Sequence, residues 1–246
     1  MHFFQRKVAD IRVSTEDELL LTFVPPPGFQ LNDFADIIVD DVIKLICCAP
    51  SKQPSLDPLP TWLLKECAEI ISPFIASLCN ASMKNGQVQK TLKEAYITPL
   101  LKKPTLDSNY INNYRPISNL SVLSKLLEKA VCKQLVSNLD ANNLIPRNQS
   151  AYRRNHSTES ALTKVFSIIM SAIDNGNLVL LSLLDLSAAF DCVDYEIVLN
   201  CLGHSFGVQS KFLKWLTSYL TGQTQCVHLS EKISFVESYV THPPDR

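Results

Sequence analysis

The chain has 246 residues, of which 46% are hydrophobic and 19% charged, and its formal net charge is −1. This length is sufficient for a buried core, and the composition is that of a globular protein and excludes a disordered one. The charge is unevenly distributed: residues 102–164 have ten Lys or Arg and four Asp or Glu, a local excess of +6 that leaves −7 for the remainder. Such a segment is typical of a phosphate-binding surface, but solvated helix faces would give the same pattern.

The sequence has eight cysteines and no C-x-x-C pair, and most of the cysteines have apolar neighbours in the sequence. This pattern predicts reduced, packed thiols and neither a disulfide framework nor a zinc site. We find no segment with the features of a signal peptide and no apolar run of membrane-spanning length. The expected location is therefore intracellular, either cytoplasmic or nuclear.

In chain order, residues 1–31 are mixed in character and contain Val-Pro-Pro-Pro-Gly-Phe, so we expect an N-terminal tail or linker. From Asn32 to Ile46 the apolar residues recur on one helical face, with Asn32 or Asp33 available as the N-cap. Two further helices are predicted over 61–71 and 73–84, the second ending at Asn85-Gly86.

The second half alternates between predicted strands and helices. A strand is expected at 95–101 and another at the apolar run 177–184. Helix start and stop signals predict a helix that begins at Ser157 or Thr158 and ends near Asn175-Gly176. This alternation favours a mixed α/β or α+β domain. The other predicted elements are helices at 121–139, 195–205 and 210–220 and strands at 224–230 and 232–240.

The apolar run 177–184 leads directly into a carboxylate, Asp185. We predict a buried strand whose last residue holds this acid at a rigid edge, where an oxygen-preferring cation such as Mg²⁺ could bind. Such a carboxylate suits two-metal phosphoryl transfer. The alternative is that Asp185 caps a helix or orders a turn. Asp191 and Asp194 are expected to be structural, and Asp194 is a natural N-cap for the helix at 195–205.

The segment Leu183–Leu202, LLDLSAAFDCVDYEIVLNCL, resembles the first palm motif of reverse transcriptases from non-LTR (LINE-type) retrotransposons. Five other segments resemble parts of the same family in the same order, so that the resemblance covers residues of roughly 34 to 240. It implies an α+β, right-hand polymerase-like fold with helical fingers over 32–176 and a partial palm sheet over 177–246. The five segments are Ser55–Lys65, Tyr96–Pro104, Asn112–Val131, Gln149–Leu162 and Lys214–Val227.

The resemblance also implies roles for residues around the first palm motif. Asp185 matches the first metal-binding, catalytic aspartate. Ala188 and Ala189 match the turn whose backbone N–H groups meet the nucleotide triphosphate. Phe190 matches the bulky residue that blocks a ribose 2′-OH and so favours deoxynucleotides, although packing in the core is an alternative role for this ring.

Basic residues upstream match the family's fingers. Arg153, in SAYRR, matches an arginine that contacts the incoming triphosphate, and a guanidinium suits this role because it binds phosphate oxygens bidentately. The family's Gly-Phe-Arg appears here as Ala151-Tyr-Arg. For Arg154 the alternative is a plain surface charge, and for Arg115 a structural role. The candidates for nucleic-acid binding are Lys102, Lys103, Arg115, Arg147 and Arg154.

The implied activity is RNA-directed DNA polymerisation with Mg²⁺, an RNA template, a DNA primer and deoxynucleotides, without a membrane; oligomeric state is not indicated. The family's Pro-Gln-Gly motif and paired aspartates do not occur in the 61 residues after Asp185. One carboxylate does not hold two Mg²⁺ ions, so we expect a truncated reverse transcriptase that is inactive alone. The alternatives are a non-catalytic RNA-binding module and a retroelement relic without function.

Overall fold

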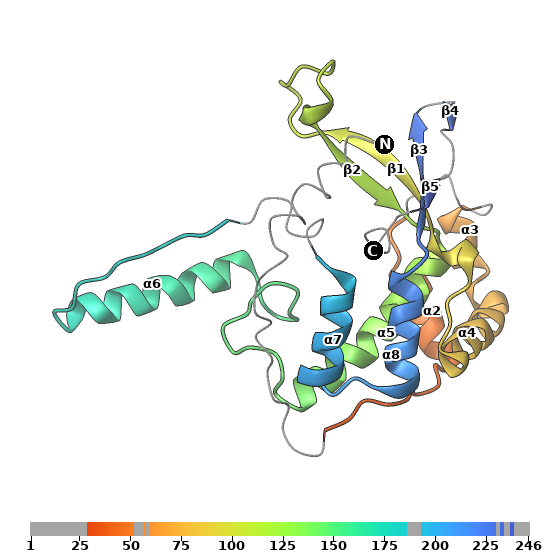
Figure 1. Ribbon diagram of the computed structural model, residues 1–246, viewed down its shortest axis with the longest axis horizontal. Helices are drawn as coiled ribbons and strands as arrows, with labels where there is room; N and C mark the ends of the chain where they lie inside the picture. The colour runs from red at the N-terminus through yellow and green to blue at the C-terminus, as the bar shows by residue number, and fades with distance from the viewer. Residues whose placement is uncertain are drawn as a thin grey trace, which may run out of the picture.

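A computed structural model describes residues 29–51, 57, 60–185, 193–229, 232–233 and 237–238. Helices form the body of the molecule, a small sheet lies at one end, and one helix, α6, projects from the body (Figure 1). The helices are α2 (Val39–Cys47), α3 (Thr61–Glu66), α4 (Ala68–Asn85), α5 (Val122–Ala141), α6 (Thr158–Asp174), α7 (Tyr195–Ser205) and α8 (Ser210–Leu220), with short 3₁₀ turns η1 (Lys90–Lys93) and η2 (Ile111–Asn113).

The described strands are β1 (Glu94–Leu101), β2 (Tyr114–Asn119), β3 (Thr224–Leu229), β4 (Lys232–Ile233) and β5 (Glu237–Ser238). They form one sheet in the order β2-β1-β3-β4, and β5 also pairs with β3. The β1–β2 pair is antiparallel, whereas β1 and β3 run parallel with Tyr96 opposite Cys226. The parallel pair joins the first half of the chain to its last part, and the combination of helices and sheet is compatible with the predicted α+β class.

The core lies where α2, α4, α5 and α8 meet. Phe212 and Trp215 of α8 are fully buried, together with Ile46 of α2, Met83 of α4 and Leu127 of α5. The core therefore combines residues from both ends of the described chain, and its two largest fully buried side chains are the aromatic ones of Trp215 and Phe212.

Several predicted helix limits are confirmed by their caps. Ser121 accepts a hydrogen bond from the backbone N–H of Ser124 at the start of α5. Ser157 and Ser160 form a reciprocal capping box at the start of α6. Asp194 accepts from the N–H groups of Glu196 and Ile197 at 2.8 and 3.2 Å, so its predicted role as the N-cap of α7 is confirmed. These caps satisfy N–H groups that have no partner within the helix.

The helix predicted from Asn32 instead begins at Val39, and residues 32–38 are not helical. Two side-chain amides hold this segment extended. Asn80 accepts from the N–H of Ile37 at 2.8 Å and donates to its carbonyl at 3.1 Å. Gln134 makes the same pair of bonds to Ala35, at 2.9 and 3.0 Å. Because each amide pairs with both backbone groups of one residue, as a neighbouring strand would, the segment has no need of helical hydrogen bonds.

Replacing Asn80 with alanine should therefore lower the free energy of unfolding by about 1–3 kcal/mol, because the N–H and C=O of Ile37 would lose their partners in a part-buried place. Urea denaturation followed by circular dichroism measures this change. Asn109→Ala is the control, since that side chain bonds only to nearby Asp107 in an exposed loop, and its effect should stay within about 0.5 kcal/mol. Equal stability of the two variants would contradict the role of Asn80.

Residues 1–31 are predicted to form a tail or linker, and this prediction is wrong for the last residue, Leu31. Leu31 is buried and forms a parallel bridge with Val208. The N–H of Leu31 donates to the carbonyl of Gly207 at 2.8 Å, and the carbonyl of Leu31 accepts from Gln209 at 2.9 Å. Gly207 has φ +65°, and a Cβ there would lie 2.6 Å from the carbonyl oxygen of Phe29, so this close approach requires glycine. Residues 1–28 lie outside the described residues.

The break predicted before Pro73 is also wrong, because the helices α3 and α4 divide at Cys67 and Pro73 lies inside α4. A proline within a helix removes one backbone hydrogen bond and costs about 3 kcal/mol. The buried side chains of Ala76, Cys79 and Met83 lie on the same helix and pack into the core. Their burial offsets the cost of the proline, and the helix continues to Asn85 and ends at Gly86 in the left-handed conformation, as predicted.

Seven cysteines lie in the described part of the chain, and all of them are free thiols. Cys79 and Cys226 are buried, whereas Cys47, Cys48 and Cys132 are exposed, so the prediction of mostly packed thiols is wrong for these three. Cys47 and Cys132 lie on helix faces that point to solvent, and Cys48 is the exposed residue directly after α2. Among the described helices none is both long and apolar enough to cross a membrane.

Candidate functional site

The predicted buried strand at 177–184 is not present. The structure gives 177–185 no strand pairing, and every residue of this segment is exposed. Leu178, Leu180 and Leu184 are more than nine-tenths exposed. Figure 1 shows the segment returning from the far end of α6 towards the body of the molecule. The apolar composition fits a strand, but a strand also needs neighbours for its hydrogen bonds, and no described strand pairs with this segment.

Asp185 is consequently exposed at the end of an extended segment. Mg²⁺ needs several oxygen ligands in near-octahedral geometry. Within the described residues no three His, Cys, Asp or Glu side chains are grouped so that they could hold a metal ion. Asp185 alone therefore does not fit a resident Mg²⁺. Residues 186–192, which include Ala188, Ala189, Phe190 and Asp191, lie outside the described residues, and their predicted roles stay predictions.

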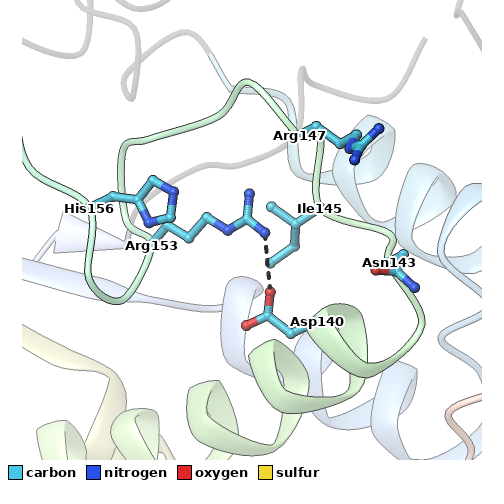
Figure 2. A pocket seen from close by; sticks show the side chains of 6 residues that line it. All are labelled: Asp140, Asn143, Ile145, Arg147, Arg153 and His156. Atoms are coloured by element: carbon cyan, nitrogen blue, oxygen red, sulfur yellow. Dashed lines mark ion pairs between the residues drawn. The ribbon is translucent and has the colours of Figure 1, made fainter. Parts of the chain in front are cut away.

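A cavity of about 550 Å³ lies between the end of α5 and the beginning of α6 (Figure 2). The connection 142–157 forms it by a series of tight turns, in which Asn143, Tyr152 and Asn155 have positive φ angles of 55–60°. Backbone hydrogen bonds between residues close in sequence stabilise these turns; the N–H of Gln149, for example, donates to the carbonyl of Pro146 at 3.0 Å. The cavity is lined by Asp140, Asn143, Ile145, Arg147, Arg153 and His156.

Arg153 extends across this cavity towards Asp140 (Figure 2). Its Nη1 donates to the carbonyl of Pro146 at 3.4 Å, and its Nη2 lies 4.0 Å from the Oδ1 of Asp140. The Arg153 side chain is 27% exposed and that of Asp140 is 46% exposed. An ion pair this long and this exposed contributes less than about 1 kcal/mol. The guanidinium is thus positioned in the cavity and keeps most of its donors for another acceptor.

The two other predicted arginines of this connection, Arg147 and Arg154, lie differently relative to the cavity. Arg147 lines the same cavity, although its guanidinium points away from that of Arg153 (Figure 2). Arg154 is exposed and does not line the cavity. His156 does line it, and sequence reasoning missed this residue. Its position between the arginines and the Ser157 cap of α6 was the available signal, because a turn that ends in a capped helix brings these residues together.

The remaining basic candidates lie together on the β1–β2 hairpin, in a separate part of the molecule (Figure 1). Lys103 and Arg115 are exposed, whereas the Lys102 ammonium donates to the carbonyl of Asn112 at 2.7 Å within the hairpin loop. Tyr110 and Ile111 of the same loop are also exposed. Basic side chains beside an exposed aromatic ring suit contact with a single nucleic-acid strand. The structure therefore places three of the predicted basic residues on the hairpin and two at the cavity, whereas Arg154 belongs to neither.

A family model, "Reverse transcriptase (RNA-dependent DNA polymerase)", matches residues 101–241, which is more than half of the sequence. The chain belongs to the reverse transcriptase family, and both the hairpin loop and the cavity lie within the matched residues. Curated relatives identify its branch as that of the non-LTR retrotransposons, so the resemblance seen in the sequence is confirmed.

Three relatives from Drosophila melanogaster illustrate this similarity. The chain is 27% identical to the RNA-directed DNA polymerase from mobile element jockey over 167 residues, 67% of this chain and 18% of the relative. It is 26% identical to the probable RNA-directed DNA polymerase from transposon BS over 199 residues, which are 80% of this chain and 22% of the relative. It is 27% identical to the probable RNA-directed DNA polymerase from transposon X-element over 223 residues, which are 89% of this chain and 24% of the relative. The chain thus spans about a fifth to a quarter of the length of these relatives.

Proposed function

We propose that this chain is the fingers and the first palm segment of an RNA-directed DNA polymerase with a right-hand architecture. In this proposal residues 32–176 form the fingers and 177–246 part of the palm. The observation that carries it is the cavity at 142–157, in which Arg153 is positioned with unused donors, inside the stretch that matches the reverse transcriptase family. A guanidinium in such a place is suited to the phosphates of an incoming deoxynucleotide.

The hairpin residues Lys102, Lys103 and Arg115 would bind the phosphate backbone of the RNA template or DNA primer. Contacts of this kind depend on salt and carry no sequence information. Ala188, Ala189 and Phe190 would surround the nucleotide's triphosphate and sugar, and Asp185 would provide one ligand for Mg²⁺. Mg²⁺ in such sites neutralises the charge that develops on the transferred phosphoryl group.

The 246-residue polypeptide should bind nucleic acid and yet fail to polymerise. It has Asp185 but neither a Pro-Gln-Gly motif nor paired aspartates in the residues that follow. A two-metal site needs more carboxylate oxygens than one aspartate offers. A non-catalytic RNA-binding module is the second candidate function, and the local charge of +6 over residues 102–164 favours it.

A primer-extension assay tests the proposal directly. With Mg²⁺ or Mn²⁺, an RNA template, a DNA primer and deoxynucleotides, the chain should give no templated product. Any product that Asp185→Ala abolishes would contradict the proposed inactivity, and would show that this aspartate acts with ligands outside the described residues.

Fluorescence anisotropy with a labelled RNA–DNA hybrid tests the nucleic-acid contacts. The double variant Lys102→Ala, Lys103→Ala should weaken binding and lower the slope of log affinity against log salt by about 1–2. The variant Lys44→Ala, Lys65→Ala removes two lysines outside the basic segment and should leave the slope unchanged. Absence of binding at low salt, or equal slopes for the two variants, would contradict the role of the hairpin.

A further inference from the structure

We propose that the cavity at 142–157 is a phosphate site controlled by two further residues: protonation of His156 strengthens the binding, and Asp140 opposes it. This inference rests on the proposed role of Arg153 as a phosphate ligand. It adds a proton-dependent donor and a competing carboxylate, which are both present in the wall of the cavity.

The geometry of His156 determines what its ring offers to the cavity. The Nδ1 of His156 lies 3.0 Å from the backbone carbonyl of Arg154. A carbonyl oxygen only accepts hydrogen bonds, so Nδ1 must carry a proton in this contact. In the neutral ring Nε2 is therefore an acceptor, which repels a phosphate oxygen. In the protonated ring Nε2 becomes a donor and the imidazolium adds a positive charge.

The charges facing His156 decide whether this proton matters for an anion. Asp140 faces the cavity from the last turn of α5, and Arg147 and Arg153 face it from the connection 142–157. These three side chains sum to a single positive charge, which a protonated His156 would double. On α6 the ammonium of Lys164 is bonded to Asn148 at 2.9 Å. Each phosphate oxygen in the cavity would thus meet a clearly stronger positive field at low pH.

Asp140 has two opposite effects in this arrangement. In the free cavity its carboxylate lies 4.0 Å from Nη2 of Arg153 and attracts the guanidinium weakly. When a phosphate enters, the same carboxylate competes for the guanidinium and repels the anion. A doubly charged phosphate that accepts two hydrogen bonds is the stronger partner, so Arg153 should transfer from Asp140 to the ligand. Asp140 therefore interacts weakly with Arg153 in the free cavity and lowers the affinity of the cavity for an anion.

Two sources could provide the phosphate, namely the terminal phosphates of a nucleotide and the backbone of a nucleic-acid strand. The chemistry at the cavity is the same for both. A volume of about 550 Å³ is within the range of small-ligand sites, and is large enough for a triphosphate. The probes are therefore sodium tripolyphosphate, dATP and a short DNA oligonucleotide without terminal phosphates.

Isothermal titration calorimetry on the full chain at constant ionic strength tests the effect of pH. The wild-type affinity for tripolyphosphate should be about fivefold to tenfold higher at about pH 5.5 than at about pH 8, because a charged imidazolium adds a donor and a positive charge to the cavity. Tripolyphosphate itself loses charge on acidification, so the ligand alone would give the opposite trend. His156→Gln should abolish the rise, and His204→Gln, which changes an exposed histidine of α7, should keep it.

The effect of Asp140 is tested in the same assay at the higher pH. Asp140→Asn should tighten tripolyphosphate binding by about threefold to tenfold, because it removes a like charge close to the anion. The control is Asp36→Asn, which breaks an exposed ion pair with Lys84 elsewhere on the surface and should leave the affinity unchanged. Tighter binding by dATP than by the oligonucleotide would identify a nucleotide as the source, and the reverse order a strand backbone.

The outcomes separate this inference from the proposed function. If tripolyphosphate binds, and Arg153→Ala weakens it, but His156→Gln retains the pH dependence, then the inference is overturned while the role of Arg153 stands. If Arg153→Ala binds tripolyphosphate as tightly as the wild type, the proposed role of Arg153 fails as well. Lack of any phosphate binding at both pH values would overturn the site itself, whatever the hairpin binds.

Discussion

Replacing Trp215 with alanine should lower the free energy of unfolding by about 3–5 kcal/mol, one of the largest changes expected for a substitution in the described core. The side chain is 1% exposed and lies at the centre of the core. Its ring stacks on Tyr219 with centroids 5.4 Å apart and meets Phe34 edge to face at 6.1 Å. Its indole N–H donates to the Oγ of Ser82 at 3.0 Å. Alanine would leave a cavity and would remove one of two hydrogen-bond partners of the Ser82 hydroxyl, which also donates to the carbonyl of Gln87.

Trp62 provides a matched control, because the sequence has only two tryptophans and this one is 57% exposed on α3. Its replacement by alanine should change stability by no more than about 0.5 kcal/mol. Urea unfolding followed by far-UV circular dichroism compares the three proteins with one signal that does not depend on tryptophan. A loss below about 1 kcal/mol for Trp215→Ala would contradict the packing of α8 into this core.

The same core shows which parts of the fold the sequence predicts well. The helices α5, α7 and α8 were predicted within two residues of their limits, because each has an apolar stripe and two of them have a side-chain cap. These signals are local: the N–H groups that Ser121 and Asp194 satisfy lie within a few residues of each cap. Local hydrogen bonds and periodicity are sufficient to define such helices before any tertiary contact is known.

Two of the incorrect predictions concern backbone whose conformation depends on partners far away in the sequence. Residues 32–38 have helical periodicity, but Asn80 and Gln134 supply hydrogen bonds that make an extended conformation favourable. Residues 177–184 have the composition of a buried strand but no described neighbour to pair with. In both segments the conformation depends on distant partners, and neither periodicity nor hydropathy reveals whether these partners are present.

The candidate site, like the fold, was predictable only in part from the sequence. Resemblance to the family identified Arg153, and the structure places this side chain in a cavity together with Arg147. The resemblance did not identify His156, which the turns of the connection 142–157 place at the cavity, or Asp140, which lines it from the last turn of α5. The positive φ angles of Tyr152 and Asn155 produce these turns. Asparagine is often found in that conformation but tyrosine rarely is, so the residue types indicate the turn only weakly.

The second large effect is expected from the apolar arm, which we define as α6 and residues 177–184. None of the residues of α6 is buried. Phe166, Met170 and Ile173 are each more than half exposed, and Leu178 and Leu180 are almost completely exposed. Figure 1 shows the arm projecting from the helical body. So many exposed apolar side chains in one part of a molecule are rare on monomeric proteins, and they drive association through the hydrophobic effect.

The chain should therefore self-associate in a concentration-dependent manner, and Leu178→Ser, Leu180→Ser, Leu183→Ser should weaken this association by at least about a hundredfold. Each leucine loses about 1.5–3 kcal/mol of burial energy on replacement, and these contributions add along one extended segment. Sedimentation velocity over a range of concentrations measures the change. The free energy of unfolding should remain nearly unchanged, because these side chains have few contacts to lose within the monomer.

The control changes three exposed apolar residues on the β1–β2 hairpin, with Leu100→Ser, Ile111→Ser and Ile117→Ser. These side chains are 41–57% exposed and do not belong to the arm, so the control should retain the association of the wild type. Equal weakening by both triple variants would mean that association is a general property of the apolar surface. A wild-type chain that stays monomeric at high concentration would show that the arm is covered within its own molecule, and that 177–184 has found the strand partner that its composition predicts.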